Sequence, residues 1–99
     1  MRTYELTYII HPDLDDTAFK ELIETIAGWI TSGGGKVVKS DVWGKRKMAY
    51  QVRKQKEGNY VHLNIELEGS QGAEIERQMG LQESVMRYLL IATEEEKQS

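Results

Sequence analysis

Two kinds of hydrophobic period follow one another along this chain, and their order limits the folds open to it. Residues 2–10 alternate between two side-chain sets, which predicts a strand. Over residues 19–30 the apolar side chains recur at helical spacing, which predicts an amphipathic helix of roughly four turns. Pro12 and the aspartates after it suit the start of that helix, and glycines 33–35 suit its end.

The rest of the chain repeats the sequence of strand, helix and strand. Residues 36–52 predict a strand that is longer than usual, and Gly44 predicts a bulge or bend within it. The elements predicted after it are a polar turn over 53–59 that contains Gly58, a strand over 60–67, a short and weak helix over 68–80, and a last strand over 84–92.

This order predicts an α+β fold of the ferredoxin-like, split βαβ type. Two right-handed crossovers would give one four-stranded antiparallel sheet with both helices on one face, and the other face would be free for a partner. Because 99 residues support one core, we expect a single domain over 1–93. The residues after it, 94–99, predict a short, acidic and mobile tail.

Charge is distributed very unevenly along the chain. The formal net charge is -3, yet residues 36–56 contain eight basic residues and one acidic residue, a net charge of +7, and the remaining residues carry -10. A local excess of this size can bind a polyanion although the whole chain is acidic. The alternative is a solvated hairpin that lysines keep soluble, and the charge pattern alone favours neither interpretation.

Catalytic and metal chemistry have little support in the sequence. There is no cysteine, and the only histidines, His11 and His62, are predicted in a turn and in a strand. The aspartates of 13–16 lack calcium-loop spacing, and the glycines of 33–35 lack phosphate-loop spacing and precede a strand. We therefore expect no catalytic residue, cofactor, metal or small-molecule substrate. No segment approaches the ~20 apolar residues of a spanning helix, so no membrane partner is expected either.

Two stretches resemble one protein family. "RTYELTYIIHPDL" resembles the opening of bacterial small-subunit ribosomal protein six, and "GKRKMAYQVR" resembles that family's signature, Gly-x-basic-polar-Leu-Ala-Tyr-x-Ile-basic. Met48 stands for Leu and Val52 for Ile, and both changes conserve volume approximately. The resemblance spans essentially the whole chain. The residues that match the signature are Gly44, Arg46, Lys47, Ala49, Tyr50 and Arg53.

The resemblance implies a ferredoxin-like fold and a non-catalytic role in the platform of the cytoplasmic small ribosomal subunit. It also implies pairing with ribosomal protein eighteen and binding to the central domain of small-subunit ribosomal RNA during assembly. The alternative is a small ferredoxin-like regulatory or self-associating module that does not bind RNA. Such a module would not need the basic residues of 36–56. A hydrolase on the same fold would require convergent polar groups, and the sequence offers no such set.

Under this resemblance the main predicted RNA contacts are Arg46 and Lys47, with Lys45 beside them. Along a strand, Lys45 and Lys47 should point one way, and Arg46, Met48 and Tyr50 the other. Arg2 and Arg87 match basic positions of the family and are further predicted RNA contacts.

Each of the weaker assignments has an alternative. Arg87 could instead form a cross-strand salt bridge with Glu5. The aromatic residues Trp43, Tyr50 and Tyr60 are predicted to contact the partner protein, although packing at a sheet edge explains them nearly as well. The basic residues near the hairpin tip favour solvent or the partner over RNA; they are Arg53, Lys54 and Lys56.

Overall fold

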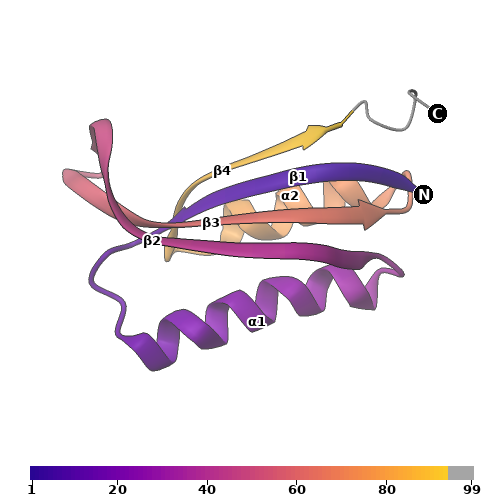
Figure 1. Ribbon diagram of the computed structural model, residues 1–99, viewed down its shortest axis with the longest axis horizontal. Helices are drawn as coiled ribbons and strands as arrows, with labels where there is room; N and C mark the ends of the chain where they lie inside the picture. The colour runs from indigo at the N-terminus through magenta and orange to yellow at the C-terminus, as the bar shows by residue number, and fades with distance from the viewer. Residues whose placement is uncertain (94–99) are drawn as a thin grey trace.

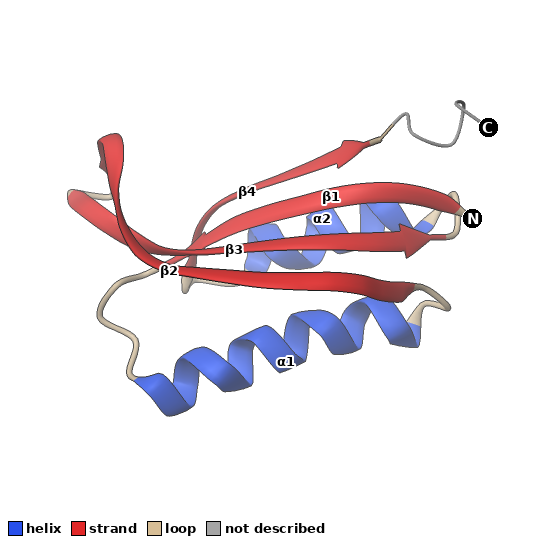
Figure 2. Cartoon of the chain, viewed as in Figure 1, coloured by secondary structure: helices blue, strands red, loops and turns tan. Residues whose placement is uncertain are grey.

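The computed structural model describes residues 1–93, so the predicted tail over 94–99 lies outside the described residues. The four strands form one antiparallel sheet in the order β2-β3-β1-β4, with the two helices packed against it (Figures 1 and 2). The predicted ferredoxin-like α+β arrangement is therefore confirmed. In chain order the elements are β1 (Arg2–Ile10), α1 (Asp16–Ser32), β2 (Lys36–Val52), β3 (Gln55–Leu67), α2 (Gln71–Leu81) and β4 (Val85–Ala92).

The helix α1 begins and ends where local chemistry sets its limits. The carboxylate of Asp15 accepts a hydrogen bond from the backbone N–H of Ala18 at 2.8 Å, which satisfies one unpaired donor of the first turn. After Ser32 the chain turns through Gly34, whose φ of +90° is readily adopted only by glycine. The capping function predicted for an aspartate is thus confirmed at Asp15.

The core lies between the helices and one face of the sheet. Side chains alternate in burial over residues 6–10 of β1 and residues 61–67 of β3, so one set of each strand packs under the helices and the other set lies on an open face. The open-face set includes Thr7 and Ile9 of β1 and Tyr60 and His62 of β3. The buried residues of the core are Leu6, Tyr8, Ile10, Leu22, Ile26, Ile30, Val61, Leu63, Ile65, Leu67, Ile75, Met79 and Val85.

The turn between β2 and β3 differs from the prediction. It consists of Arg53 and Lys54 alone, whose φ angles of +53° and +66° are those of a two-residue type I′ hairpin turn. Gly58 is not in a turn, because it is buried within β3 opposite Arg46. A Cβ atom there would collide with the Cγ2 atom of Ile9, so the position requires glycine for close packing.

Candidate nucleic-acid interface

The basic segment lies on the β2–β3 hairpin, whose free end extends beyond the helices and curls away from the sheet (Figure 1). Lys47 of β2 pairs with Glu57 of β3, but the next pair is Val52 with Gln55. Four residues of β2, 48–51, therefore stand opposite a single residue of β3. We call residues 48–51 the bow. Such a mismatch bends the longer strand and increases its twist, which explains the curl.

A second irregularity, at Gly44, orients an aromatic ring. Gly44 has a φ of +82° and interrupts the register of β2, which confirms the predicted bulge. Beside it, the ring of Trp43 stacks on two side chains of the open face. The ring centroids lie 6.3 Å from Tyr60 and 5.6 Å from His62, with interplanar angles of 18° and 7°. Trp43 and Tyr60 are thus brought together as one aromatic surface.

Arg46 completes this surface. Its guanidinium carbon lies 5.6 Å from the centroid of the Trp43 ring, within range of a cation–π contact. A hydrogen bond to Thr7 orients the ring of His62, whose Nδ1 atom lies 2.8 Å from the Oγ1 atom of Thr7. This hydrogen bond joins the third strand to the first across the open face. No sequence pattern pointed to His62, because the stack depends on the bulge at Gly44.

Tyr50 lines a small hollow together with Tyr60 and contacts β4 through Arg87. Arg87 donates a hydrogen bond from Nη1 to the hydroxyl of Tyr50, and its guanidinium carbon lies 5.4 Å from the centroid of that ring. The alternative prediction of a salt bridge between Arg87 and Glu5 is wrong. Arg87 pairs with Ile9 across the strands, while Glu5 lies farther along β1.

Arg53 at the turn is bound to its own chain. Its Nη1 atom donates to the carbonyl oxygen of Glu83 at 2.7 Å, and its Nη2 atom donates to that of Val85 at 3.4 Å. Arg53 is exposed, as predicted, but it also has a role within the chain that the sequence did not predict. The side chain ties the tip of the hairpin to the loop before β4. Sequence reasoning missed this role because the contacts span 30 and 32 residues of chain.

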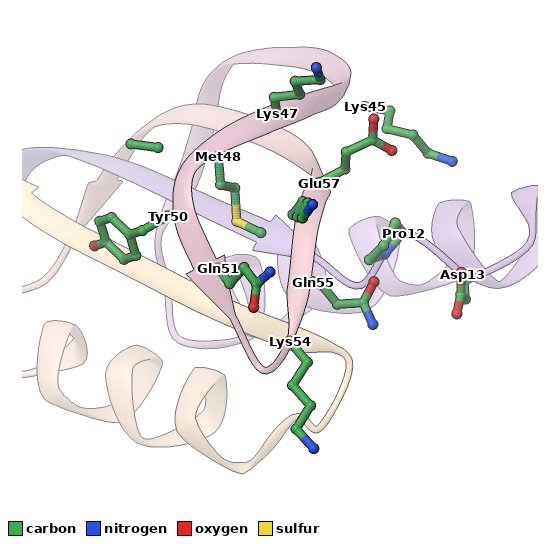
Figure 3. A pocket seen from close by; sticks show the side chains of 12 residues that line it. Pro12, Asp13, Lys45, Lys47, Met48, Tyr50, Gln51, Lys54, Gln55 and Glu57 are labelled. Carbon is green, nitrogen blue, oxygen red and sulfur yellow. The ribbon is translucent and has the colours of Figure 1, made fainter.

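The three adjacent cations divide between the two sides of β2. Lys45 and Lys47 line a hollow of about 660 Å³ within the hairpin (Figure 3), whereas Arg46 lies over Trp43. The predicted alternation holds for these three cations but not for Met48 and Tyr50, which also line this hollow because the bow interrupts the regular strand. All three are exposed. Within residues 1–93, the ion pairs closer than 4.0 Å involve other basic residues, namely His11, Lys39 and Arg77. The three cations are therefore available to an external anion.

Arg2 is the predicted site residue that the structure does not bring to the hairpin. It begins β1, pairs with Leu67 and lies at the opposite end of the molecule from the tip (Figure 1). The other predicted residues, from Trp43 to Lys47 together with Tyr50, Tyr60 and Arg87, lie on the hairpin or beside it.

The described residues were predicted to lack a metal site and a membrane-spanning helix. Across residues 1–93, no three His, Asp or Glu side chains gather in a way that could hold a metal ion. In that same part of the chain, no helix combines the length and apolar character needed to cross a membrane.

Comparison with known proteins gives one consistent result. The family described as "Ribosomal protein S6" matches residues 3–92. The small ribosomal subunit protein bS6 of Thermoanaerobacter pseudethanolicus is 42% identical over 95 residues, 96% of this chain and 100% of that protein. The protein of the same name from Fusobacterium nucleatum is 40% identical over 91 residues, 92% of this chain and 97% of that one. The crystal structure of 30S ribosomal protein S6 from Thermotoga maritima is similar with a TM-score of 0.93 at 26% identity, covering 98% of this chain and 92% of that one.

Proposed function

Because this chain belongs to the ribosomal protein S6 family, we propose that it binds the central domain of small-subunit ribosomal RNA together with ribosomal protein eighteen during assembly of the platform. Membership of the family makes the chain a structural, non-enzymatic component of the small ribosomal subunit. The proposal adds the RNA region, the protein partner and the surface that each would use on the cytoplasmic ribosome.

The observation that carries the RNA proposal is the set of three exposed cations on the hairpin. Lys45, Arg46 and Lys47 have no carboxylate within 4.0 Å among residues 1–93. Binding of such side chains to phosphates releases counterions, which gives affinity and positions the protein without reading sequence. The Arg46 guanidinium also presents a rigid planar fork of donors that matches two phosphate oxygens, whereas a lysine ammonium acts as a point charge.

We propose that the partner protein contacts the aromatic residues of the same hairpin. Trp43 is 45% exposed and Tyr50 is 61% exposed, and each carries an arginine against its ring. Aromatic and arginine side chains are enriched at the centres of protein interfaces. With Tyr60 beside Trp43, these rings would contact ribosomal protein eighteen while the neighbouring cations contact RNA. Binding of both partners would then be cooperative.

Arg87 and Arg2 are proposed as two further RNA contacts. Arg87 is exposed on β4 next to the bow, so it extends the cationic surface of the hairpin. Arg2 lies at the far end of the sheet, so it would contact a different segment of the RNA.

The test is binding to a central-domain fragment of the ribosomal RNA, with and without the partner protein, across a salt series. The variant Arg46→Glu, Lys47→Glu is compared with Lys20→Glu, Arg77→Glu, which makes the same change of net charge on the helices. We expect the hairpin variant to lose binding and the helix variant to keep it. The slope of log affinity against log salt should fall by about one for each contact removed.

Equal binding by both variants would show that the hairpin cations are not the RNA contact, and Arg2 and Arg87 would then be tested. Absence of binding in the wild type, with an active partner present, would overturn the proposal. In that case sedimentation of the free protein would test the self-associating module, for which the exposed side chains of Leu89 and Ile91 on β4 offer an apolar surface.

A further inference from the structure

We propose that the hollow inside the hairpin, bounded by the bow, binds a single unpaired nucleotide of the RNA. This inference rests on the proposed function and adds a binding site to it. The cations described above would attract any polyanion, whereas this site would select a feature of the RNA, namely a base that is free of its pair.

The hollow exists because of the mismatch between β2 and β3. Four residues facing one cannot all lie in a flat ladder, so the bow leaves the plane and a space opens between it and the turn after β1. The space measures about 660 Å³, which is within the range of about 300–1,000 Å³ typical of small-molecule sites. Its lining comes from the β1–α1 turn (Pro12, Asp13), from β2 (Lys45, Lys47, the bow) and from the hairpin end (Lys54, Gln55, Lys56, Glu57).

The rim of the hollow carries a positive charge. Four lysines line it against two carboxylates, those of Asp13 and Glu57. Two of the lysines belong to β2 and the other two to the turn and β3, so cations lie on both strands that bound the space. A nucleotide within a strand carries a phosphate on each side. Cations on both strands can neutralise these two phosphates while the base lies between them.

The interior of the hollow contains an apolar side chain that can pack against a base and amide groups that can form hydrogen bonds with its edge. Figure 3 shows the side chains of Met48 and Gln51 between the two strands and that of Gln55 on the other side of β3, and all three line the hollow. Methionine is flexible and polarizable, and it packs well against an aromatic face. A glutamine amide both donates and accepts, so it can pair with a base edge, as it does with the N6 and N7 atoms of adenine.

The base must be unpaired for two reasons. In double-stranded RNA the major groove is too deep and narrow for side chains, and the shallow minor groove is recognised mostly by shape, so proteins recognise RNA sequence mainly at loops, bulges and ends. The hollow is bounded by a single hairpin and the β1–α1 turn, and it lies beyond the flat part of the sheet. An isolated extruded base could enter it, whereas a base pair would need a longer groove.

The first measurement uses the folded protein and adenosine monophosphate as the probe, followed by ¹⁵N–¹H NMR. We expect shifts of the side-chain amides of Gln51 and Gln55 and of the backbone of 48–57. Ribose 5-phosphate and inorganic phosphate should shift the backbone resonances of the four lysines that line the hollow, but not the side-chain amide resonances of Gln51 and Gln55. The variant Gln51→Ala, Gln55→Ala should bind adenosine monophosphate about tenfold more weakly, since one good amide–base pairing contributes between about fivefold and about 150-fold. Thr25→Ala, an exposed polar truncation on α1, is the control.

Equal shifts and equal affinity with ribose 5-phosphate would show that the hollow binds anions only, which would overturn the inference. So would an unchanged affinity in the double glutamine variant. Neither glutamine belongs to the hydrophobic core, so the variant is expected to fold, and its spectrum reports this directly.

A second measurement separates this inference from the proposed function. The same variants are assayed with the central-domain RNA fragment and the partner protein. RNA binding that is equal in wild type and the glutamine variant would overturn the nucleotide site and leave the proposed function standing. Specific binding of adenosine monophosphate without RNA binding would overturn the proposed function and leave the hollow as a nucleotide site.

Discussion

The two ends of the β2–β3 pair differ in what holds them. Near the helices, Val61, Leu63, Ile65 and Leu67 of β3 are at most 2% exposed, and the register shifts of β2 opposite this part, between Val37 and Lys39 and between Val42 and Gly44, each add a single residue. Beyond Gly58 the same strands lie past β1, and β2 carries four residues against one. A buried face fixes register, because a slip of one residue would expose it to water. Where burial stops, a larger mismatch is tolerated, and four residues of β2 form the bow opposite one residue of β3.

We expect most of the stability to come from the packed part of the sheet. The largest effect is therefore expected from a large-to-small substitution in the core. Ile26 on α1 is fully buried, so Ile26→Ala should lower the free energy of unfolding by about 3 kcal/mol through lost burial and a cavity. Denaturant unfolding measures this. RNA affinity of the folded variant should stay within twofold of the wild type. A loss of affinity in a folded variant would break the separation between the two regions.

The second test acts at the boundary between the regions. Gly58→Ala places a Cβ atom against Ile9 and within 3.0 Å of the Cε atom of Met86, so it should cost about 2 kcal/mol. Gly28→Ala is the matched control. A Cβ atom there meets nothing within 4 Å, and alanine is the better helix former by about 1 kcal/mol, so this variant should be more stable than the wild type. Thermal unfolding of both would show whether the β3 backbone at Gly58 is closely packed.

A third test concerns a polar atom inside the packed region. The Tyr8 hydroxyl is buried, and among residues 1–93 it has no hydrogen-bond partner. Burial also raises the pKa of this phenol well above its ordinary value. Tyr8→Phe removes the desolvation cost, so the variant should gain about 1 kcal/mol of stability in denaturant unfolding. A loss of similar size would show that the hydroxyl is hydrogen-bonded in solution.

A fourth test addresses the hairpin, where the effect on stability should be small. Arg53→Ala removes two hydrogen bonds to backbone carbonyls from an exposed side chain, so we expect a loss below about 1 kcal/mol. Amide hydrogen exchange over 48–56 should nevertheless become faster, because the tip is no longer tied to the loop before β4. Arg53→Lys keeps the charge but lacks the planar fork, and it should show the same faster exchange. Slow exchange in Arg53→Lys would show that charge alone holds the tip.

The smallest effect is expected from an exposed pair on α2. Hydrogen bonds from the Arg77 guanidinium, at 2.7 and 3.1 Å, lower the pKa of the Glu74 carboxyl. A lowered pKa means that the folded state favours the carboxylate, so its contribution is present near neutral pH and is lost as the pH falls through the folded pKa. The thermal midpoint of the wild type should exceed that of Glu74→Gln slightly at about pH 7, and the difference should disappear once the pH is low enough to protonate the carboxyl in the folded state. RNA binding should not change.

The sequence predicted what depends on local periodicity. The helix stripe from Phe19 to Ile30, the alternation of β1 and β3, and the bulge at Gly44 could all be inferred from neighbouring residues. The turn could not, because Arg53 and Lys54 adopt positive φ angles although neither is glycine or asparagine. Gly58 was misplaced for the complementary reason, since its glycine serves packing against Ile9 and not a turn.

The candidate site was predictable in composition but not in geometry. The cation run and the aromatic residues were evident in the sequence, and the alternation of Lys45 and Lys47 against Arg46 follows from strand geometry. The contacts from Arg53 to the loop before β4 and from Arg87 to Tyr50 join segments that are distant in sequence. The bow depends on how many residues of β2 face β3, and a single strand has no signal for that number.

The order of the strands also determines when the chain can fold as it is made. β1 leaves the ribosome first, yet it lies between β3 and β4 in the sheet. Its pairing with β4 must wait until residues 85–92 have been synthesised, and Thr93 donates a hydrogen bond back to the carbonyl of Thr3 at 3.0 Å. Contacts between such distant segments form late in folding. One edge of β1 therefore stays open during nearly all of translation, exposed to the aggregation that unpaired strand edges favour.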